Sequence, residues 1–297
     1  MDESKQSSLV LIKCCKRKRI FKTRCKPLFT FLLLLLFTTK IFCQKQIGLD
    51  SLRKYSYSLL GYKLLNNQLI PVGGSCFFIR KANRIFLVTA RHVVNGCEGA
   101  VKDKFFPKTI QLTIEDLPSN EGELPFTFLT INISEVIKNT PCNNSNLDII
   151  AFEITDTITK KLFSVENFIH KPFKKVDDVE MFGFPGSSYL GPHGSFIRGN
   201  KPSNLHLTRN NVEYYSDSNH ASMIKIVSNE LKADSTYLKG YSGSPVFIKK
   251  YHSHKLRICG AFAEFGYDKI NTDFRFIGVE KIDYAMRQIV SLINKDK

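Results

Sequence analysis

The sequence predicts an all-β fold that ends in one α-helix. Short apolar runs recur between residues 75 and 279, and clusters of polar residues separate them. After residue 281 the apolar residues recur at the spacing of a helix instead. Many short strands with irregular loops, followed by a single helix, are typical of a β-barrel or β-sandwich protein.

Two apolar runs in the first half of the chain predict a hairpin of buried strands. Ser75–Arg80 and Arg84–Ala90 lie on either side of a polar turn at Lys81–Asn83. Residues 44–70 are mixed in character, so a strand and a short helix both remain open there. Further strands are expected at Ile110–Ile114, Phe126–Ile133 and Leu147–Ile154.

The second half predicts another hairpin and the terminal helix. Pro245–Lys250 and Lys255–Phe262 are joined by a polar turn, and single strands are expected at Val179–Phe184 and Phe274–Val279. Over Lys281–Asn294 the apolar residues fall on one face of a helix, which we expect to pack on the body of the protein. These residues are Ile282, Ala285, Met286, Ile289, Val290 and Ile293.

The first 43 residues have the features of a secretory signal. A basic stretch precedes the apolar run Leu28–Phe37, and polar residues return after it. The run is too short for a comfortable membrane span, which needs about 20 residues. We therefore expect export, to the periplasm or out of the cell, with cleavage after Cys43. Retention of residues 1–43 as a membrane anchor is the alternative.

Half of the basic excess lies in this N-terminal segment. The whole chain has a net charge of +16, and residues 1–43 hold ten Lys and Arg against two Asp and Glu, or +8. The other +8 is scattered along residues 44–297. Recognition of nucleic acid would need a concentrated basic face in the folded part, so no nucleic-acid partner is expected.

Four cysteines follow the N-terminal segment: Cys76, Cys97, Cys142 and Cys259. Cys76 and Cys97 flank the strand and turn that lead to His92, so they are the best candidates for a disulfide. Two buried free thiols are an equally good interpretation. No Cys-x-x-Cys pair or His/Cys cluster occurs, so we expect no metal and no other cofactor.

The segment Gly240–Pro245 (GYSGSP) has the features of a turn that activates a serine. A hydroxyl is a weak nucleophile, so it needs a base nearby and donors for the oxyanion that forms on attack. Glycine permits unusual backbone angles and lets a substrate carbonyl approach the N–H groups. We expect the N–H groups of Gly240 and Ser242 to be these donors. A glycine-rich turn without chemistry is the alternative.

His92 and Asp148 complete this chemical pattern. His92 follows the predicted strand Arg84–Ala90, and its imidazole can act as a base near neutral pH. Asp148 directly precedes the apolar run IIAF, where its carboxylate could orient the imidazole. Taken singly, each residue has a structural explanation, as a histidine at a strand end and an aspartate that terminates a turn.

These motifs together resemble those of the trypsin-like (chymotrypsin-fold) serine peptidases. The order His92, Asp148, Ser242 is the order in that family. TARHVV at residues 89–94 is similar to its histidine motif, and GYSGSP matches its Gly-x-Ser-Gly-x-Pro motif. GFPG at residues 183–186 is similar to a turn of bacterial members, including the HtrA-like proteases. The resemblance covers roughly residues 70–290.

The resemblance implies two packed antiparallel β-barrels with a C-terminal helix. The first barrel, in residues 44–163, would carry His92 and Asp148, and the second, in residues 164–297, would carry Ser242. Thr236 would line the primary specificity pocket, and with no acid there a strict preference for Lys or Arg is not expected. The edge segment that pairs with the substrate backbone by strand addition would be Ala263, Glu264 and Phe265.

The resemblance also implies the activity of a serine endopeptidase. Such an enzyme hydrolyses peptide bonds through an acyl-enzyme intermediate, and its partners are protein or peptide substrates. Contact with a membrane is expected only through the N-terminal segment, if that segment is kept. The alternative function is that of a catalytically inactive trypsin-like fold that serves as an exported binding module. The physiological substrate and the oligomeric state are left open.

Overall fold

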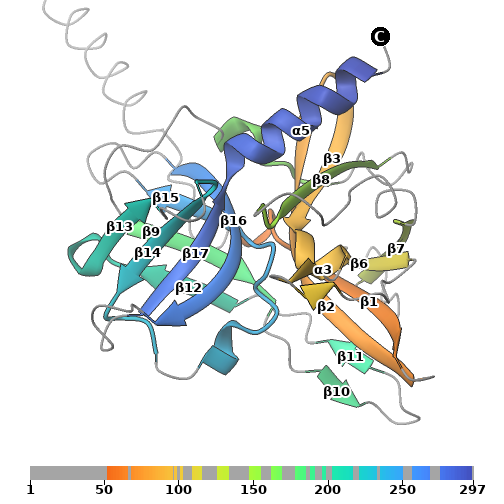
Figure 1. Ribbon diagram of the computed structural model, residues 1–297. Helices are drawn as coiled ribbons and strands as arrows, with labels where there is room; N and C mark the ends of the chain where they lie inside the picture. The colour runs from red at the N-terminus through yellow and green to blue at the C-terminus, as the bar shows by residue number, and fades with distance from the viewer. Residues whose placement is uncertain are drawn as a thin grey trace, which may run out of the picture. The chain divides into compact units, whose positions relative to one another are not determined.

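The structure is a computed structural model with two large antiparallel sheets and a C-terminal helix (Figure 1). The mostly-β class with a final helix is therefore confirmed. No helix among the described residues is both long and apolar enough to cross a membrane. The structure describes residues 52–65, 68–95, 97–98, 101–102, 109–115, 126–133, 147–154, 162–168, 178–184, 188–190, 196–198, 203–216, 221–232, 235–249, 256–267 and 275–295. The predicted signal at 1–43 lies outside them.

Within the described residues, the first sheet has six strands in the order β7-β6-β1-β2-β3-β8, and every neighbouring pair is antiparallel. All of its strands come from residues 57 to 154. The strands are β1 (Tyr57–Leu65), β2 (Gln68–Lys81), β3 (Arg84–Ala90), β6 (Thr109–Glu115), β7 (Phe126–Asn132) and β8 (Ile149–Ile154).

In the part of the chain that the structure describes, the second sheet has seven strands in the order β12-β9-β15-β16-β17-β14-β13, again all antiparallel. It is built from residues 178 to 281. The strands are β9 (Asp178–Gly183), β12 (Ser203–Leu207), β13 (Val212–Ser216), β14 (Met223–Ser228), β15 (Pro245–Lys249), β16 (Leu256–Tyr267) and β17 (Arg275–Lys281).

Short elements connect these sheets or extend from them. Two small hairpins, β4–β5 and β10–β11, stand apart from the large sheets. Their strands are β4 (Cys97–Glu98), β5 (Val101–Lys102), β10 (Ser188–Leu190) and β11 (Phe196–Arg198). The described helices include α3 (Arg91–Asn95), α5 (Ile282–Lys295) and the 3₁₀ turns η3 (Glu166–Phe168), η5 (Arg209–Asn211) and η6 (Ser235–Leu238).

Both predicted hairpins are confirmed, as β2–β3 and β15–β16. Of the two possibilities for residues 44–70, the strand holds over β1. The sequence did not predict β12, β13 and β14.

Within the described residues both large sheets have open strand orders, with no pairing between their first and last strands. Two closed barrels therefore remain a prediction.

The strands β3 and β8 are buried on both faces, which explains their continuous apolar sequences. Side chains alternate between two clusters. Ile85 and Leu87 belong to a cluster formed by the first sheet, whereas Phe86 and Val88 belong to a cluster shared with the second sheet and α5. Burial of this shared apolar surface holds the two sheets and the helix together. A third cluster lies on the second sheet alone.

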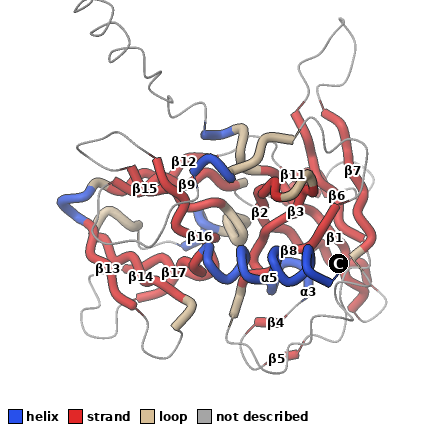
Figure 2. Tube along the Cα trace, turned by 90° about the horizontal axis from the view of Figure 1, so that it is seen from above, coloured by secondary structure: helices blue, strands red, loops and turns tan. Residues whose placement is uncertain are grey.

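The helix α5 packs along the edge strand β8, as both views show (Figures 1 and 2). Its buried residues are Ile282, Ala285 and Ile289, so the predicted face is confirmed there. Val290 lies at the margin of that face and is 39% exposed. Gln288 accepts a hydrogen bond from the Ala151 N–H at 2.8 Å and donates one to the Ile149 carbonyl at 3.2 Å. The helix thus satisfies backbone groups along the outer edge of β8.

Candidate functional site

The pairing of β3 with β8 brings His92 and Asp148 together. Its register sets Ala90 opposite Ile149. Beyond this pair the Arg91 N–H still donates to the Asp148 carbonyl, at 3.2 Å. The chain then turns into α3, which carries His92 at its second position. Two residues that are 56 positions apart in the sequence therefore meet because two neighbouring apolar strands pair.

Asp148 contacts His92 at two points. The His92 backbone N–H donates to Asp148 Oδ1 at 2.9 Å. The second carboxylate oxygen, Oδ2, lies 2.6 Å from His92 Nδ1. With two contacts to one carboxylate, the backbone and the ring of the histidine are oriented together.

This geometry selects one tautomer of the imidazole. Because the carboxylate can only accept, Nδ1 carries the proton, and the neutral ring presents a lone pair at Nε2. The two side chains are 19% and 23% exposed, so the ring is neither buried nor free in solvent. A histidine held in this way can take a proton from a group placed at Nε2.

The second sheet also reaches Asp148. The Asp148 N–H donates to Oε1 of Glu280, at 3.0 Å. Glu280 is fully buried in β17, and Arg91 is also buried. Burial lowers the pKa of the Arg91 guanidinium, while the negative charges of Asp148 and Glu280 act to raise it. The acid beside His92 therefore adjoins two buried charged residues, Arg91 and Glu280, that the sequence did not predict.

Ser242 lies in a tight turn between η6 and β15. The glycines on either side of it, Gly240 and Gly243, have φ of 91° and 89°, a region that favours glycine. The turn is closed by a hydrogen bond from the Ser244 N–H to the Tyr241 carbonyl, at 2.7 Å. The Tyr241 ring is buried in the cluster of the second sheet and so holds the turn against that sheet.

The serine turn packs on the first sheet at the residues that lead to His92. A side chain on Gly243 would place its Cβ 2.0 Å from the Ser75 carbonyl oxygen, 2.2 Å from Thr89 Oγ1 and 2.9 Å from the Ala90 nitrogen. Glycine is therefore required here by close approach as well as by backbone angle. Thr89 and Ala90 immediately precede Arg91 and His92.

The residue that follows His92 also lies near the serine turn, with Gly74 of β2 between them. A Cβ on Gly74 would lie 2.7 Å from the Ser242 carbonyl oxygen and 2.6 Å from Cγ2 of Val93. Val93 follows His92 in α3. The backbone of Ser242 is thus close to a residue adjacent to His92, and the Ser242 carbonyl accepts a hydrogen bond from the Ser75 N–H at 2.7 Å.

Sequence reasoning missed Ser75. Its side chain is fully buried, and its hydroxyl donates to the Gly240 carbonyl at 2.8 Å and accepts from the Phe184 N–H at 3.1 Å. Its carbonyl accepts from the Thr89 hydroxyl at 2.7 Å. The sequence signal was a polar residue at the start of the apolar run SCFFIR. Its partner Gly240 is 165 positions away, which is why the run alone could not reveal the role.

The predicted edge segment, Ala263–Phe265, begins beside the serine turn. Phe262 exchanges two hydrogen bonds with the turn, one to the Gly243 N–H at 2.8 Å and one to the Ser244 carbonyl at 2.9 Å. The pairing of β16 with β15 ends at Ala261, whereas its pairing with β17 continues to Tyr267. Ala263 is buried, Glu264 is exposed and Phe265 is half-buried.

Thr236 lies in η6, four positions before Gly240, and its side chain is not described. Cys76 is a buried cysteine with no disulfide, and Cys97 lies in β4. Of the two interpretations, the candidate Cys76–Cys97 disulfide is therefore not formed, and Cys76 is instead a buried thiol in the core cluster of the first sheet. In the described part of the chain, no group of three or more His, Cys, Asp or Glu could hold a metal.

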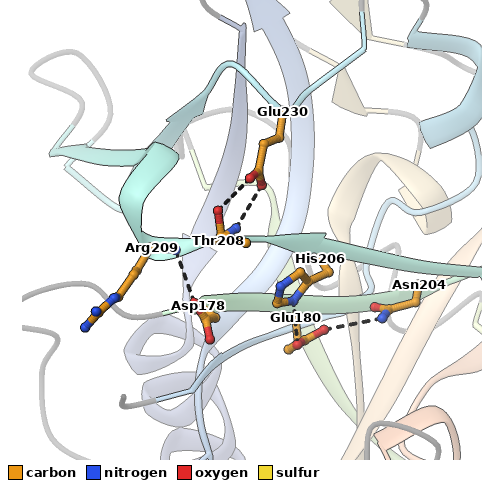
Figure 3. Close-up of polar contacts among 7 residues, drawn as sticks. All are labelled: Asp178, Glu180, Asn204, His206, Thr208, Arg209 and Glu230. Carbon is orange, nitrogen blue, oxygen red and sulfur yellow. Dashed lines mark hydrogen bonds and ion pairs between the residues drawn. The ribbon is translucent and has the colours of Figure 1, made fainter. Parts of the chain in front are cut away.

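A second histidine–carboxylate pair lies at the outer edge of the second sheet (Figure 3). His206 on β12 pairs with Glu180 on β9, with 2.7 Å between Nδ1 and Oε1, and Asn204 donates to the other carboxylate oxygen at 3.4 Å. Burial raises the pKa of Glu180, and the hydrogen bonds and charge of His206 oppose this shift. The contacts of the serine turn with the first sheet lie around His92, so His92 is the better candidate for a base.

Comparison with known proteins gives only remote structural likeness. No protein-family model matches the chain, and no curated protein is similar in sequence. The fold is similar to the protease Anisep from Arthrobacter nicotinovorans, with 16% identity and a TM-score of 0.43 over 76% of this chain and 90% of that one. It is also similar to the active form of the Rv3671c protease from M. tuberculosis, with 14% identity and a TM-score of 0.43 over 82% and 83%. Likeness at this level carries no argument about function.

Proposed function

We propose that this protein is a serine endopeptidase in which Ser242 is the nucleophile, His92 the general base and Asp148 the residue that orients the base. The observation that carries the proposal is the two-point contact of Asp148 with His92, next to a glycine-flanked serine turn. That turn packs against residues that precede His92 in the first sheet, and the Ser242 carbonyl lies near a residue that follows His92. A structural histidine at a strand end would need no such turn beside it.

The proposed reaction begins with attack of the Ser242 hydroxyl oxygen on the carbonyl carbon of the scissile peptide. His92 Nε2 takes the hydroxyl proton, and the hydrogen bond from Nδ1 to Asp148 stabilises the imidazolium that results. The N–H groups of Gly240 and Ser242 donate to the oxyanion of the tetrahedral intermediate. His92 then gives its proton to the leaving amine, which leaves an acyl group on Ser242.

The second half of the reaction uses the same groups. His92 removes a proton from a water molecule that attacks the acyl carbonyl, and the acid product leaves as Ser242 recovers its proton. The substrate strand would lie along Ala263, Glu264 and Phe265, directly after the residue that bonds to the serine turn. With Thr236 at the position that would line the primary pocket, we propose a small or apolar side chain at the cleavage site.

Hydrolysis of a labelled, unfolded protein such as casein tests the proposal with the full-length chain. We expect cleavage by the wild type and a loss of at least about a thousandfold with Ser242→Ala or His92→Ala, because the triad acts as a unit. The matched control is Ser244→Ala. The Ser244 hydroxyl is buried and has no hydrogen-bond partner among the described residues, so its removal should preserve cleavage.

The alternative function, an inactive trypsin-like fold that binds a partner, makes the opposite prediction. A well-folded wild type would then fail to cleave casein, and none of the three substitutions would change this result. Tight binding of a protein ligand without its cleavage would support that alternative.

We also propose that the chain is exported and that residues 1–43 direct this export. The mass of the mature protein recovered from its host tests the proposal. A mass that begins at Gln44 supports a cleaved signal, and the full-length mass in a membrane fraction supports the retained anchor. A full-length protein in the cytoplasm would contradict both.

A further inference from the structure

All four polar groups of Asp148 are held by other residues, and they are held from both sheets. Its two carboxylate oxygens contact His92, and its carbonyl accepts from the Arg91 N–H. These bonds come from the first sheet and the turn that follows it. The remaining group, the N–H, donates to Glu280 of the second sheet, 132 positions away.

Glu280 is unusual because it is an acidic residue with no exposed surface. Burial of a carboxylate is costly unless opposite charge and hydrogen bonds compensate it. Two compensating groups are present, the Asp148 N–H at 3.0 Å and the buried guanidinium of Arg91. Arg91 directly precedes His92 in the chain, and Asp148 holds the His92 ring. The burial of Glu280 is therefore compensated by Arg91 and Asp148, and Glu280 in turn holds the Asp148 backbone.

The charges of this group respond to a proton on His92. With both carboxylates ionised and Arg91 charged, the cluster of Arg91, Asp148 and Glu280 has a net charge of −1. Uptake of a proton by His92 brings the total to zero. Without the charge of Glu280, the same uptake would bring the total from zero to +1, which low-dielectric surroundings disfavour.

We propose that Glu280 is a positioning residue that holds Asp148 from the second sheet and, together with Arg91, sets the pH range in which His92 acts as the base. The proposal rests on the proposed function for its kinetic consequence. Its structural part, the control of the His92–Asp148 pair by Glu280, does not need turnover.

The test measures the rate of inactivation of the full-length protein by a fluorophosphonate probe across pH. In Glu280→Gln an acceptor remains but the charge is lost, so we expect the acidic limb of the profile to move to lower pH by roughly one unit. In Arg91→Gln a positive charge is lost, so the limb should move to higher pH. Arg91→Lys keeps the charge and should return the limb toward its wild-type position.

Opposite shifts from two substitutions in one cluster would not arise from general loosening of the fold. The matched control is Glu180→Gln, because Glu180 is another buried glutamate of the second sheet, paired with His206 rather than with Asp148. It should change thermal stability without moving the acidic limb. Equal profiles for the wild type, Glu280→Gln and Arg91→Gln would overturn the proposal.

A second readout separates this proposal from the proposed function. A proton on His92 Nδ1 that is hydrogen-bonded to Asp148 should give a strongly downfield NMR signal, and following its titration does not require catalysis. If the wild type fails to react with the probe, the proposed function fails. The proposal for Glu280 then stands if this titration moves to lower pH in Glu280→Gln, and it falls if the titration is unchanged. Should Glu280→Gln fail to fold, Arg91→Gln and Arg91→Lys provide the same comparison.

Discussion

Ser75 connects the two halves of the candidate site through bonds that no local pattern would reveal. Its N–H and its hydroxyl donate to the carbonyls of Ser242 and Gly240, the two residues whose N–H groups are proposed to bind the oxyanion. A carbonyl that is fixed in direction also fixes the peptide plane that it belongs to. The planes fixed here carry the N–H groups of Tyr241 and Gly243, so Ser75 orients the peptides next to the proposed donors rather than the donor N–H groups themselves. The position of the proposed oxyanion site therefore depends indirectly on a residue of the first sheet.

Ser75→Ala removes the hydroxyl and leaves the Gly240 carbonyl and the Phe184 N–H without this partner. We expect the free energy of unfolding to fall by about 1–3 kcal/mol, since buried polar groups lose their bond. The rate of fluorophosphonate labelling should fall by roughly tenfold or more, as expected for a poorly oriented donor. Ser56→Ala is the control, because the Ser56 hydroxyl is buried without a hydrogen-bond partner in the described part of the chain. An unchanged labelling rate in Ser75→Ala would contradict this account.

The buried thiol of Cys259 should make the stability of the fold depend on pH in the alkaline range. Burial in β16 raises the pKa of its thiol from 9.0 to about 12. The folded state thus holds this proton more tightly than the unfolded state, so the resulting stability is present below about pH 9 and is lost as the pH rises toward 12. Between about pH 9 and pH 12 the Tm should fall less steeply with pH for Cys259→Ala than for the wild type. Parallel curves, or rapid alkylation of native Cys259 near neutral pH, would contradict the prediction.

At the scale of elements, the hairpin β2–β3 carries both the Ser75 contacts and the strand that leads to His92. Its two-residue turn is Ala82–Asn83, with φ of 52° and 60°. Lys81 and Arg84 pair across it. Both positive φ angles suit a type I′ turn, in which Asn followed by Gly is preferred and Ala is strained.

The double substitution Ala82→Asn with Asn83→Gly should therefore stabilise the protein. We expect a gain of about 1 kcal/mol, or roughly 2–4 °C in Tm for a protein of this size. Differential scanning calorimetry measures it, and the reversed order, Ala82→Gly with Asn83 kept, is the comparison. A lower Tm for the Asn-Gly variant would show that the turn does not have this geometry in solution.

Strands with a clear apolar pattern in their own sequence were predictable, and strands without one were not. The β2–β3 and β15–β16 hairpins each consist of two apolar runs around a polar turn, so pairing between sequence neighbours was sufficient. By contrast, β12 is mostly exposed and its sequence SNLHL contains little apolar pattern. Such a strand is specified by its neighbour β9, whose position a single sequence does not reveal.

At the scale of the whole molecule, the same distinction holds for the candidate site. The three residues with familiar motifs, His92, Asp148 and Ser242, could be named from sequence because each sits beside a recognisable strand or turn. Glu280 could not, because the predicted strand Phe274–Val279 ended one residue before it. Its significance comes only from a bond between the two sheets. Contacts across the sheet boundary are what the sequence leaves undetermined.

The shared apolar cluster explains why such long-range bonds can be maintained. It includes Phe86 of β3, Phe247 of β15 and Ala285 of α5, so the first sheet, the second sheet and the helix bury surface against one another. Close packing of this kind limits the movement of one sheet relative to the other. The short bonds from Ser75 to the serine turn and from Asp148 to Glu280 rely on that restriction.

The central claim is that Ser242 is a nucleophile activated by His92. Its most direct test is covalent labelling of the full-length protein with a fluorophosphonate, followed by mapping of the modified residue by mass spectrometry. We predict an adduct on Ser242 that is absent in His92→Ala and kept in Ser244→Ala. A well-folded wild type that takes up no label, or a label on Ser242 that survives the loss of His92, would contradict the account.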